Sequence, residues 1–249
     1  MEKKSGINTV MYDELGERWY TAHDDPVALL RRQSLTIGPW VISKLQENFG
    51  SGDKPKILDV GCGAGFLSNA LGGQGFEVTG LDLSEDSLEV ARKHDHTKKI
   101  NYVQGDAAHL PFVENSFDAV TAMDFLEHVE DPARLVREVS RVLKPGGLFL
   151  YHTFNRNPVS WLVIIKFVEW FVRNTPKNLH LYSLFVKPSE LKEYCEESGL
   201  KTIENMGIAP RLSSMKVKNL LSRTVPEDFE FVLTGSTLLS YIGYAKKNV

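Results

Sequence analysis

The stretch ILDVGCGAG, which runs from Ile57 to Gly65, joins an apolar run to the start of a predicted helix. From Asp59 onward its glycines follow the pattern D-x-G-x-G-x-G. A nicotinamide or flavin fingerprint has the spacing G-x-G-x-x-G, which fails here because the residue three positions after Gly63 is Phe66. Glycines let backbone approach a ligand closely, whereas Asp59 would repel a pyrophosphate and suit an ammonium group. A tight strand–helix turn without a ligand is the alternative.

Short apolar or β-branched runs alternate with helical patterns after residue 55, as is typical of a mostly parallel sheet with helices on both faces. The predicted strands are Lys56–Val60, Glu77–Leu83, Ile100–Val103, Phe117–Ala122, Leu148–Thr153, Leu200–Ile208 and Thr237–Tyr244, the last two as an antiparallel pair at the sheet edge. The predicted helices are Gly65–Leu71, Ser84–His94, Pro132–Leu143 and Pro188–Ser198. We therefore expect a Rossmann-like α/β fold with a seven-stranded sheet, in a single domain over residues 1–249, with residues 1–50 forming a helical N-terminal arm.

Composition narrows the class of protein. The chain has 249 residues, a formal charge of −3 and a pI of about 6.2, so no basic surface suggests a nucleic-acid partner. Two cysteines, Cys62 and Cys195, form no disulfide framework and suit a reducing compartment. The first residues show no apolar signal sequence, and no run reaches the ~18 apolar residues of a spanning helix. We expect a cytoplasmic protein.

Two further acidic residues stand at predicted strand ends. Asp82 follows the second strand about 20 residues after the glycine turn, where a carboxylate can accept hydrogen bonds from ribose hydroxyls. Asp106 follows the third strand, where it can accept from an adenine amino group. Together with Asp59 they suit a cationic nucleoside amino acid such as S-adenosylmethionine better than a phosphate. A turn residue is the alternative reading for each aspartate alone.

The segments ILDVGCGAG, VTGLDLS, GDAAHLPF, FDAVTAMDFLEHVEDP and LKPGG together resemble the class I S-adenosylmethionine-dependent methyltransferases. The segments MDFLEHVEDP, NRNPVSWL, PKNLH and FVKPSEL are more narrowly similar to the ubiquinone-biosynthesis O-methyltransferases, which methylate polyprenyl catechols and demethylubiquinols. The chain differs from that family's pattern at Asp124, where glutamate is usual, and at Arg31–Ser34, which replaces an N-P-x-R stretch. The cofactor contacts that we expect are Asp59, Gly61, Cys62, Gly63, Gly65, Asp82, Leu83, Asp106, Ala107 and Met123.

The stretch MDFLEHVEDP places an acidic and imidazole group at the end of the fourth strand, beside the cofactor strand. The resemblance implies that Asp124, Glu127 and His128 hold a divalent cation, Mg²⁺ or Zn²⁺, near the acceptor oxygen. Alternatively, His128 acts as a general base without metal, or the three residues are structural. The resemblance also implies catalytic or substrate roles for Glu127, His128, Asn155 and His180. Asn155 or Asn157 as a helix cap, and an exposed His180, are the alternatives.

The segment Pro158–Lys177 is the most apolar helical stretch, and it lies inside a predicted helical lid over residues 156–187. Between Trp161 and Val172 only Lys166 and Glu169 are charged. Twelve residues span about 18 Å, which is too short to cross a bilayer of ~30 Å. The stretch is therefore either core or a peripheral membrane contact, the latter favoured by its tryptophans and flanking basic residues.

The predicted activity is S-adenosylmethionine-dependent O-methylation of a hydroxylated polyprenyl benzenoid or quinol in ubiquinone-type biosynthesis. A methyltransferase for another phenol, amine or natural-product intermediate is the enzymatic alternative, and a non-catalytic lipid-binding relative is the alternative from another class. We expect no nucleic-acid partner.

Overall fold

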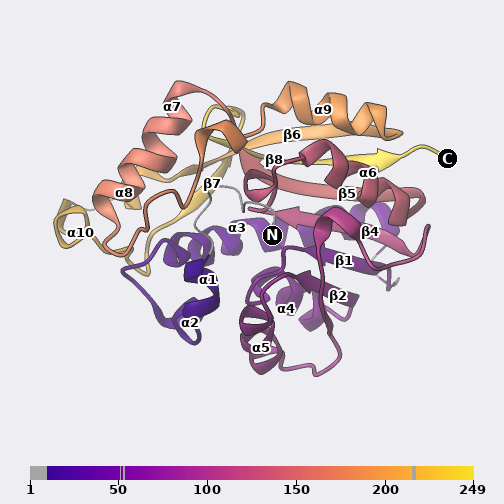
Figure 1. Cartoon of the computed structure of the whole chain (residues 1–249), viewed down its shortest axis with the longest axis horizontal. Coiled ribbons are helices and arrows are strands. Elements are labelled where there is room, and N and C mark those ends of the chain that lie inside the picture. Colours follow the sequence, from indigo (N-terminus) through magenta and orange to yellow (C-terminus); the bar gives the residue numbers. More distant parts are fainter. Residues whose placement is uncertain (1–9, 51, 53, 215–216) are drawn as a thin grey trace, which may run out of the picture.

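The computed structural model describes residues 10–50, 52, 54–214 and 217–249. In this part of the chain, eight strands form one sheet in the order β3-β2-β1-β4-β5-β8-β6-β7 (Figure 1). The strands are β1 Lys56–Val60, β2 Glu77–Asp82, β3 Asn101–Gln104, β4 Phe117–Met123, β5 Leu143–Phe154, β6 Leu200–Pro210, β7 Phe231–Thr234 and β8 Ser240–Lys247. Strands β1 to β5 are parallel, whereas β8 is antiparallel to β5 and β6, and β7 is antiparallel to β6.

The helices cover both faces of this sheet. They are α1 Val10–Glu14, α2 Arg18–Thr21, α3 Val27–Phe49, α4 Phe66–Gly73, α5 Glu85–His94, α6 Pro132–Val142, α7 Pro158–Ser160, α8 Val168–Phe171, α9 Pro188–Glu197 and α10 Val217–Ser222. Apolar side chains of α3 and α4 form one buried cluster with the strands, and those of α6 and α9 form another on the opposite face. The α/β fold is thus built around two apolar layers with the sheet between them.

The predicted five parallel strands and the antiparallel pair β6–β8 are confirmed, but the predicted strand count of seven is wrong. The additional strand β7 pairs with the end of β6, and its sequence lies in a segment without a clear alternating pattern. The pair is also not the edge, because β8 lies between β5 and β6. Tertiary pairing, rather than local preference, makes β7 a strand.

The predicted helix Pro132–Leu143 is confirmed to within one residue, and the segment Lys144–Gly147 that follows it belongs to β5. Helix α6 ends at Val142, and β5 begins at Leu143 with an irregular pairing, since Phe117 pairs with Leu143 but Ala119 pairs with Leu148. A side chain on Gly147 would place its Cβ 2.8 Å from the carbonyl oxygen of Asp118. The glycine therefore permits the close approach of β4 that the bulge requires.

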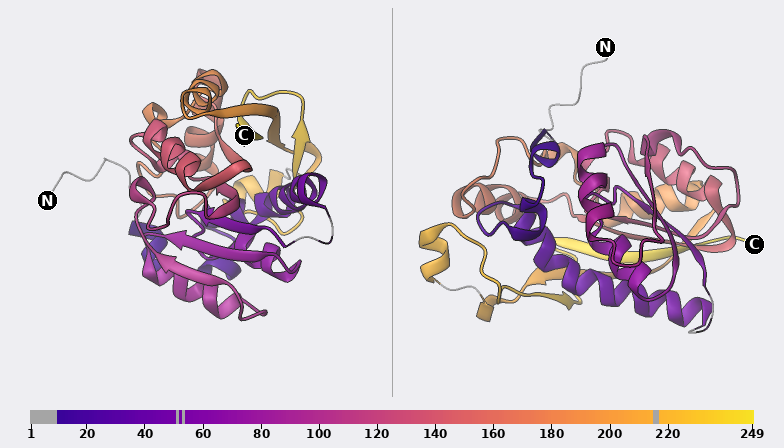
Figure 2. Two further views of the ribbon diagram at one scale, coloured as in Figure 1. Left: turned by 90° about the vertical axis from the view of Figure 1, so that its right-hand side faces the viewer. Right: turned by 90° about the horizontal axis from the view of Figure 1, so that it is seen from below.

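In the described part of the N-terminal arm, α1 and α2 lie at one end of the sheet, whereas α3 runs along one of its faces (Figure 2). Trp19 of α2 packs with Leu15, Ala64 and Val90, so the arm contacts the turn after β1 and helix α5. At the same end lie α7, α8 and α10, with a π-helical stretch Trp161–Phe167 joining α7 to α8 (Figure 1). Within the described ranges, no helix has both the length and the apolar character needed to cross a membrane.

Candidate active site

The glycine-rich turn between β1 and α4 adopts the backbone that the sequence pattern requires. Gly61, Gly63 and Gly65 have φ values of 69°, 51° and 80°, a left-handed region that favours glycine. A Cβ on Gly61 would lie 2.2 Å from the ring of Phe125, and one on Gly65 would lie 2.6 Å from the hydroxyl of Tyr102. Because larger residues would clash at these positions, only glycine lets the rings of Phe125 and Tyr102 pack directly on the turn.

Asp59 supports this turn from inside the protein. Its side chain is only 2% exposed, and its two oxygens accept hydrogen bonds from Ser68 Oγ at 2.6 Å and Thr121 Oγ1 at 2.7 Å. Burial raises the pKa of this carboxyl to about 6, although both hydroxyl donors oppose the shift. The structure thus gives Asp59 an anchoring role between β1, α4 and β4, and its direct cofactor contact stays a prediction.

Asp82 lies at the carboxyl end of β2 and faces the turn. Its Oδ2 accepts from the backbone N–H of Gly63 at 2.8 Å, and its Oδ1 accepts from the N–H of Ser84 at 2.9 Å. Burial raises the pKa of this carboxyl, while the backbone donors oppose the shift. Leu83 is strongly exposed beside it, and Cys62 lies half-buried in the turn. The predicted ribose acceptor is therefore held by the same turn that carries the glycines.

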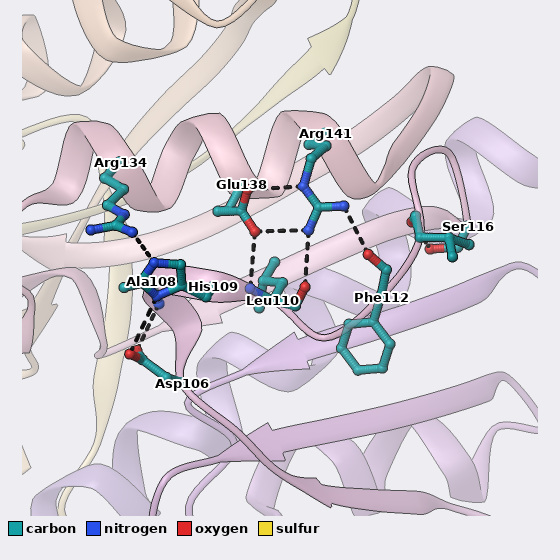
Figure 3. Close-up of polar contacts among 10 residues, drawn as sticks. Asp106, Ala108, His109, Leu110, Phe112, Ser116, Arg134, Glu138 and Arg141 are labelled. Atoms are coloured by element: carbon teal, nitrogen blue, oxygen red, sulfur yellow. Dashed lines mark hydrogen bonds and ion pairs between the residues drawn. The ribbon is translucent and has the colours of Figure 1, made fainter.

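Asp106 begins the short 3₁₀ turn Ala107–His109 and accepts from the N–H of Ala108 at 2.8 Å (Figure 3). Its other oxygen lies 3.7 Å from His109 Nδ1, and the carboxylate is largely exposed. Ala107 is buried behind it. Asp106 therefore serves as a turn residue in this structure, and its contact with adenine stays a prediction.

The loop that follows this turn is held from α6. Glu138 accepts from the N–H of Leu110 at 2.9 Å, and Arg141 donates to the carbonyls of Leu110 and Phe112 at 2.9 and 2.8 Å (Figure 3). The Glu138–Arg141 ion pair, at 2.7 Å, completes the network. The loop that follows Asp106 and its 3₁₀ turn is thus fixed to helix α6.

The arm contributes aromatic residues that the sequence patterns did not single out. The ring of Trp19 covers the turn, since a Cβ on Gly63 would lie 3.2 Å from its Cη2, and Tyr20 donates to the carbonyl of Ala64 at 2.9 Å. Tyr12 stacks on Trp19 with ring centroids 5.4 Å apart and meets the edge of His128 at 6.1 Å. The arm therefore reaches from the cofactor turn to the predicted catalytic histidine.

Tyr12 lies near three carboxyl groups that influence the pKa of its hydroxyl. Its pKa is raised chiefly by burial, with further contributions from the charges of Glu127, Asp124 and Asp82. These groups come from the ends of β2 and β4, so the arm tyrosine marks the point where the cofactor side and the acceptor side of the site meet. Carboxyl groups gathered around one point suit the sulfonium cation of S-adenosylmethionine.

Glu127 and His128 lie in a short 3₁₀ turn after β4 and carry unsatisfied atoms. Glu127 is fully buried, and its Oε2 accepts from Thr153 Oγ1 at 2.7 Å. Among the described residues, Glu127 Oε1 and His128 Nδ1 are buried without a hydrogen-bond partner. Leaving such groups unpaired costs about 1–3 kcal/mol each, so they are candidates for contact with a ligand.

Asp124 has a different partner. Its Oδ1 lies 2.9 Å from His152 Nδ1 and accepts from Gln33 Nε2 at 2.8 Å. Its φ of 51° is left-handed, which is uncommon for a residue with a side chain and is found at functional sites. His152, at the end of β5, and Gln33, on α3, were not among the predicted site residues. Only the folded sheet brings them together.

The titrating groups of this region are strongly shifted. Burial, aided by the charge of Asp124, raises the pKa of Glu127 to about 8. Burial lowers the pKa of His128 to about 4, whereas Asp124 opposes that shift. Burial would also lower the pKa of His152, but Asp124 outweighs it and raises the value. Perturbed groups gathered at a strand end are typical of a catalytic site.

The two remaining predicted residues behave differently from each other. The ring of His180 lies 5.3 Å from that of His128 and 5.1 Å from that of Phe154, so the C-terminal part of the predicted lid does reach the site. Asn155 donates to the carbonyl of Thr237 at 2.8 Å and ties β5 to the segment before β8, so its substrate contact stays a prediction. Asn157 is the helix cap, since it accepts from the N–H groups of Val159 and Ser160, both at 3.0 Å.

The predicted metal ligands do not converge in this arrangement. No group of three or more histidine, cysteine, aspartate or glutamate side chains in the described part of the chain is placed to hold a metal ion. Asp124 turns toward His152, while Glu127 and His128 keep one free atom each. Two of the three predicted ligands thus have the donor atoms available, and the requirement for a metal stays a prediction. Met123, the predicted adenine neighbour, is half-buried at the end of β4 and pairs with His152.

Comparisons with known proteins agree with this geometry. A family described as "Methyltransferase domain" matches residues 58–151. The chain is 37% identical to a protein of Thiobacillus denitrificans named ubiquinone biosynthesis O-methyltransferase, over 84% of this chain and 88% of the relative. A protein of the same name from Aromatoleum aromaticum is 35% identical, over 80% of this chain and 83% of the relative.

Solved structures show the same fold. Magnesium protoporphyrin IX methyltransferase from Synechocystis PCC 6803, with bound SAH, aligns with a TM-score of 0.60 at 16% identity over 99% of this chain and 90% of its own. A SAM-dependent methyltransferase from Methanosarcina mazei aligns with a TM-score of 0.58 at 22% identity, over 85% of this chain and 98% of its own. The glycine turn with Asp82, the strand order and the similarity to curated relatives agree, and the chain belongs to the class I S-adenosylmethionine-dependent methyltransferases and is an enzyme of that family.

Proposed function

We propose that the chain O-methylates a hydroxylated polyprenyl benzenoid or quinol in ubiquinone-type quinone biosynthesis. The observation that supports this proposal is a pair of buried atoms without hydrogen-bond partners among the described residues, Glu127 Oε1 and His128 Nδ1. They lie where the N-terminal arm, the end of β4 and the C-terminal part of the lid meet. The rings of Tyr12 and His180 lie next to His128, and Phe154 packs on His180, as would suit a benzenoid acceptor. The names of the relatives from Thiobacillus and Aromatoleum support the same substrate class.

The chemistry requires a proton to leave the acceptor. A phenol with a pKa of about 10 is mostly neutral at pH 7, and ionising it costs roughly 4 kcal/mol. Glu127, which is mostly protonated at pH 7 and ionises as the pH rises through its pKa of about 8, accepts that proton on Oε1 in its ionised form, while Thr153 fixes its other oxygen. His128 would orient the acceptor hydroxyl from the neighbouring position. S-adenosylmethionine, when bound, supplies an electrophilic methyl group: the new oxygen–carbon bond forms as the sulfur–carbon bond breaks.

The test is transfer of a labelled methyl group to a panel of acceptors. The panel should contain a short-chain prenyl catechol, a catechol without a prenyl group, a monophenol and an aromatic amine. Preferential labelling of the prenyl catechol is the expected result. Labelling of the amine or monophenol alone would instead favour the second candidate, a methyltransferase for another acceptor. The engagement of Asp124 by His152 and Gln33, away from Glu127 Oε1, is the feature that favours this second candidate.

As an alternative use of the same two atoms, we propose that a divalent cation, Mg²⁺ or Zn²⁺, activates the phenol in place of the Glu127 base. Glu127 and His128 would hold it through their unpaired atoms, and such a cation would lower the pKa of a bound phenol as a Lewis acid. Chelation with EDTA should reduce turnover about tenfold or more, restored by Mg²⁺ or Zn²⁺, while cofactor affinity remains the same. Full turnover of a metal-stripped sample would leave Glu127 and His128 acting without metal.

A peripheral membrane contact through residues 158–177 completes the proposal. On the lid, Trp161 and Trp170 are 39% and 57% exposed, and Val159 and Leu162 are exposed next to them. Arg173 and Lys177, which are also exposed, follow the apolar stretch. Exposed tryptophans beside basic residues suit the headgroup region of a bilayer, where a polyprenyl substrate resides.

A further inference from the structure

A polar cavity of about 490 Å³ lies outside the active site, between the arm and the segment that follows α10. Its walls include Tyr20, His23, Arg31, Arg32, Val225 and Glu227. The glycine turn, Asp82 and the Glu127–His128 couple do not line it. Its volume is within the range of small-molecule sites.

The cavity holds more positive than negative charge. Arg31 donates Nη1 to the carbonyl of Trp19 at 2.9 Å and also bonds the carbonyl of Ala22. Arg32 donates Nε to the carbonyl of Phe229 at 2.7 Å. In the described part of the chain neither guanidinium has a carboxylate within ion-pair distance, so both positive charges are bonded only to neutral oxygens.

The carboxylate in the cavity wall does little to balance these charges. Glu227 is 86% exposed at its side chain and lies 3.9 Å from His23 Nε2. Burial, followed by the charge of Arg32, lowers the pKa of Arg31, and Glu227 opposes this only partly. Two half-buried guanidinium groups that repel each other are stabilised by an anion placed between them.

The walls of the cavity are tied together, so the charges are held in place. The N–H of Val225 donates to the carbonyl of His23 at 2.7 Å. Ala28 and Val225 pack against Val172, which ends α8, and so connect the cavity to the lid. The cavity is thus preorganised. Its wall packs against Val172, which follows α8, the helix that carries the exposed Trp170.

We propose that this cavity, which we call the Arg31–Arg32 pocket, binds a phosphate-type anion. The forked guanidinium group matches the oxygens of a phosphate in a bidentate way, and within the described residues the Nη groups of Arg32 have no hydrogen-bond partner. The phosphate belongs either to a small soluble ligand or to an anionic lipid headgroup at the surface that the lid faces. Both sources share the chemistry that the pocket recognises.

The first experiment titrates the full chain with inorganic phosphate against chloride at matched ionic strength, by calorimetry and by the thermal midpoint. Arg32→Gln should weaken phosphate binding about tenfold or more, because it removes charge-assisted hydrogen bonds. Arg137→Gln is the matched control, since Arg137 is exposed on α6, has the same charge and does not line the pocket. No phosphate binding by the wild type, or an equal loss in both variants, would overturn the proposal.

A second variant protects the test if Arg32→Gln fails to fold. Glu227→Gln removes an exposed like charge and should tighten phosphate binding about twofold to threefold. Unchanged or weaker binding in this variant would contradict the proposal.

Vesicles distinguish the two sources of phosphate. If phosphatidylglycerol vesicles bind the wild type, lose binding in Arg32→Gln and are displaced by inorganic phosphate, the occupant is a lipid headgroup. If vesicle binding is the same in Arg32→Gln and in the presence of inorganic phosphate, while the phosphate titration shows the tenfold loss, the occupant is a soluble phosphate.

Discussion

The cofactor side and the acceptor side of the proposed active site are built in different ways. The cofactor side uses one continuous segment, since Asp59, the three glycines and Asp82 all lie within β1, its turn and β2. The acceptor side is assembled from separate elements. These are Tyr12 of α1, Gln33 of α3, Glu127 of the turn after β4, His152 of β5 and His180 of the lid.

The cofactor side is therefore a local unit of the chain, whereas the acceptor side is assembled from several elements. The cofactor side is held mainly by hydrogen bonds within its own segment, from Gly63 to Asp82 and from Ser68 to Asp59, and also by the hydroxyl of Thr121 on β4. An assembled surface depends on every element that contributes to it, so a change in one helix alters its chemistry. The predictions below test whether the two sides are separable.

The largest expected effect is on the acceptor side. Glu127→Gln keeps the shape of the side chain but cannot accept the acceptor proton, so turnover should fall by about 10²–10⁴-fold. Binding of S-adenosylhomocysteine, measured by calorimetry, should remain within about twofold if the two sides are separable. Glu130→Gln, at an exposed position three residues away, is the control and should keep full activity. A comparable loss of cofactor affinity in Glu127→Gln would show that the sides are not separable.

The next effect is on the cofactor side. Asp82→Ala removes a carboxylate that accepts from Gly63 and Ser84, so S-adenosylhomocysteine should bind about 10–100-fold more weakly or worse. Asp86→Ala, at an exposed position on α5, should leave the affinity unchanged. Unaltered affinity in the Asp82 variant would remove this aspartate from the cofactor site.

The contrast between the local cofactor side and the assembled acceptor side also explains which parts of the site could be predicted from the sequence. The glycine turn and Asp82 were predictable, because their spacing along the chain is also their arrangement in space. The partners of Asp124 were not, since Gln33 and His152 are separated from it by 91 and 28 positions and meet only through the sheet and α3. Strand β7 was missed for a similar reason, because its pairing with β6 is tertiary.

A smaller effect concerns the support beneath the turn. The pKa of Asp59 is raised to about 6, so the folded protein keeps this proton at pH values where the unfolded chain has released it. Its contribution to stability is therefore full below about pH 4 and is lost as the pH rises through 6, a loss of about 3 kcal/mol. Asp59→Asn should abolish this part of the pH dependence in the free energy of unfolding, measured by denaturant titration. An identical slope in the variant and the wild type would contradict the shift.

The smallest effect is expected at the lid. Trp161→Ser combined with Trp170→Ser should reduce sedimentation with anionic vesicles severalfold, because these exposed side chains would enter the headgroup layer. Turnover of a short-chain soluble catechol should survive, since neither tryptophan is among the residues of the acceptor site. Loss of folding in this variant, or no vesicle binding by the wild type, would assign the stretch to the core.

The proposed mechanism requires above all that Glu127 and His128 present a proton acceptor to a phenolic hydroxyl beside the cofactor. The most direct measurement is the transfer of a labelled methyl group from S-adenosylmethionine to a short-chain prenyl catechol by the wild type and by Glu127→Gln, with cofactor binding checked in both. The account predicts labelled methyl ether from the wild type and a loss of at least about 10²-fold in the variant at equal cofactor occupancy. Label on the catechol at the same rate with both proteins would contradict it.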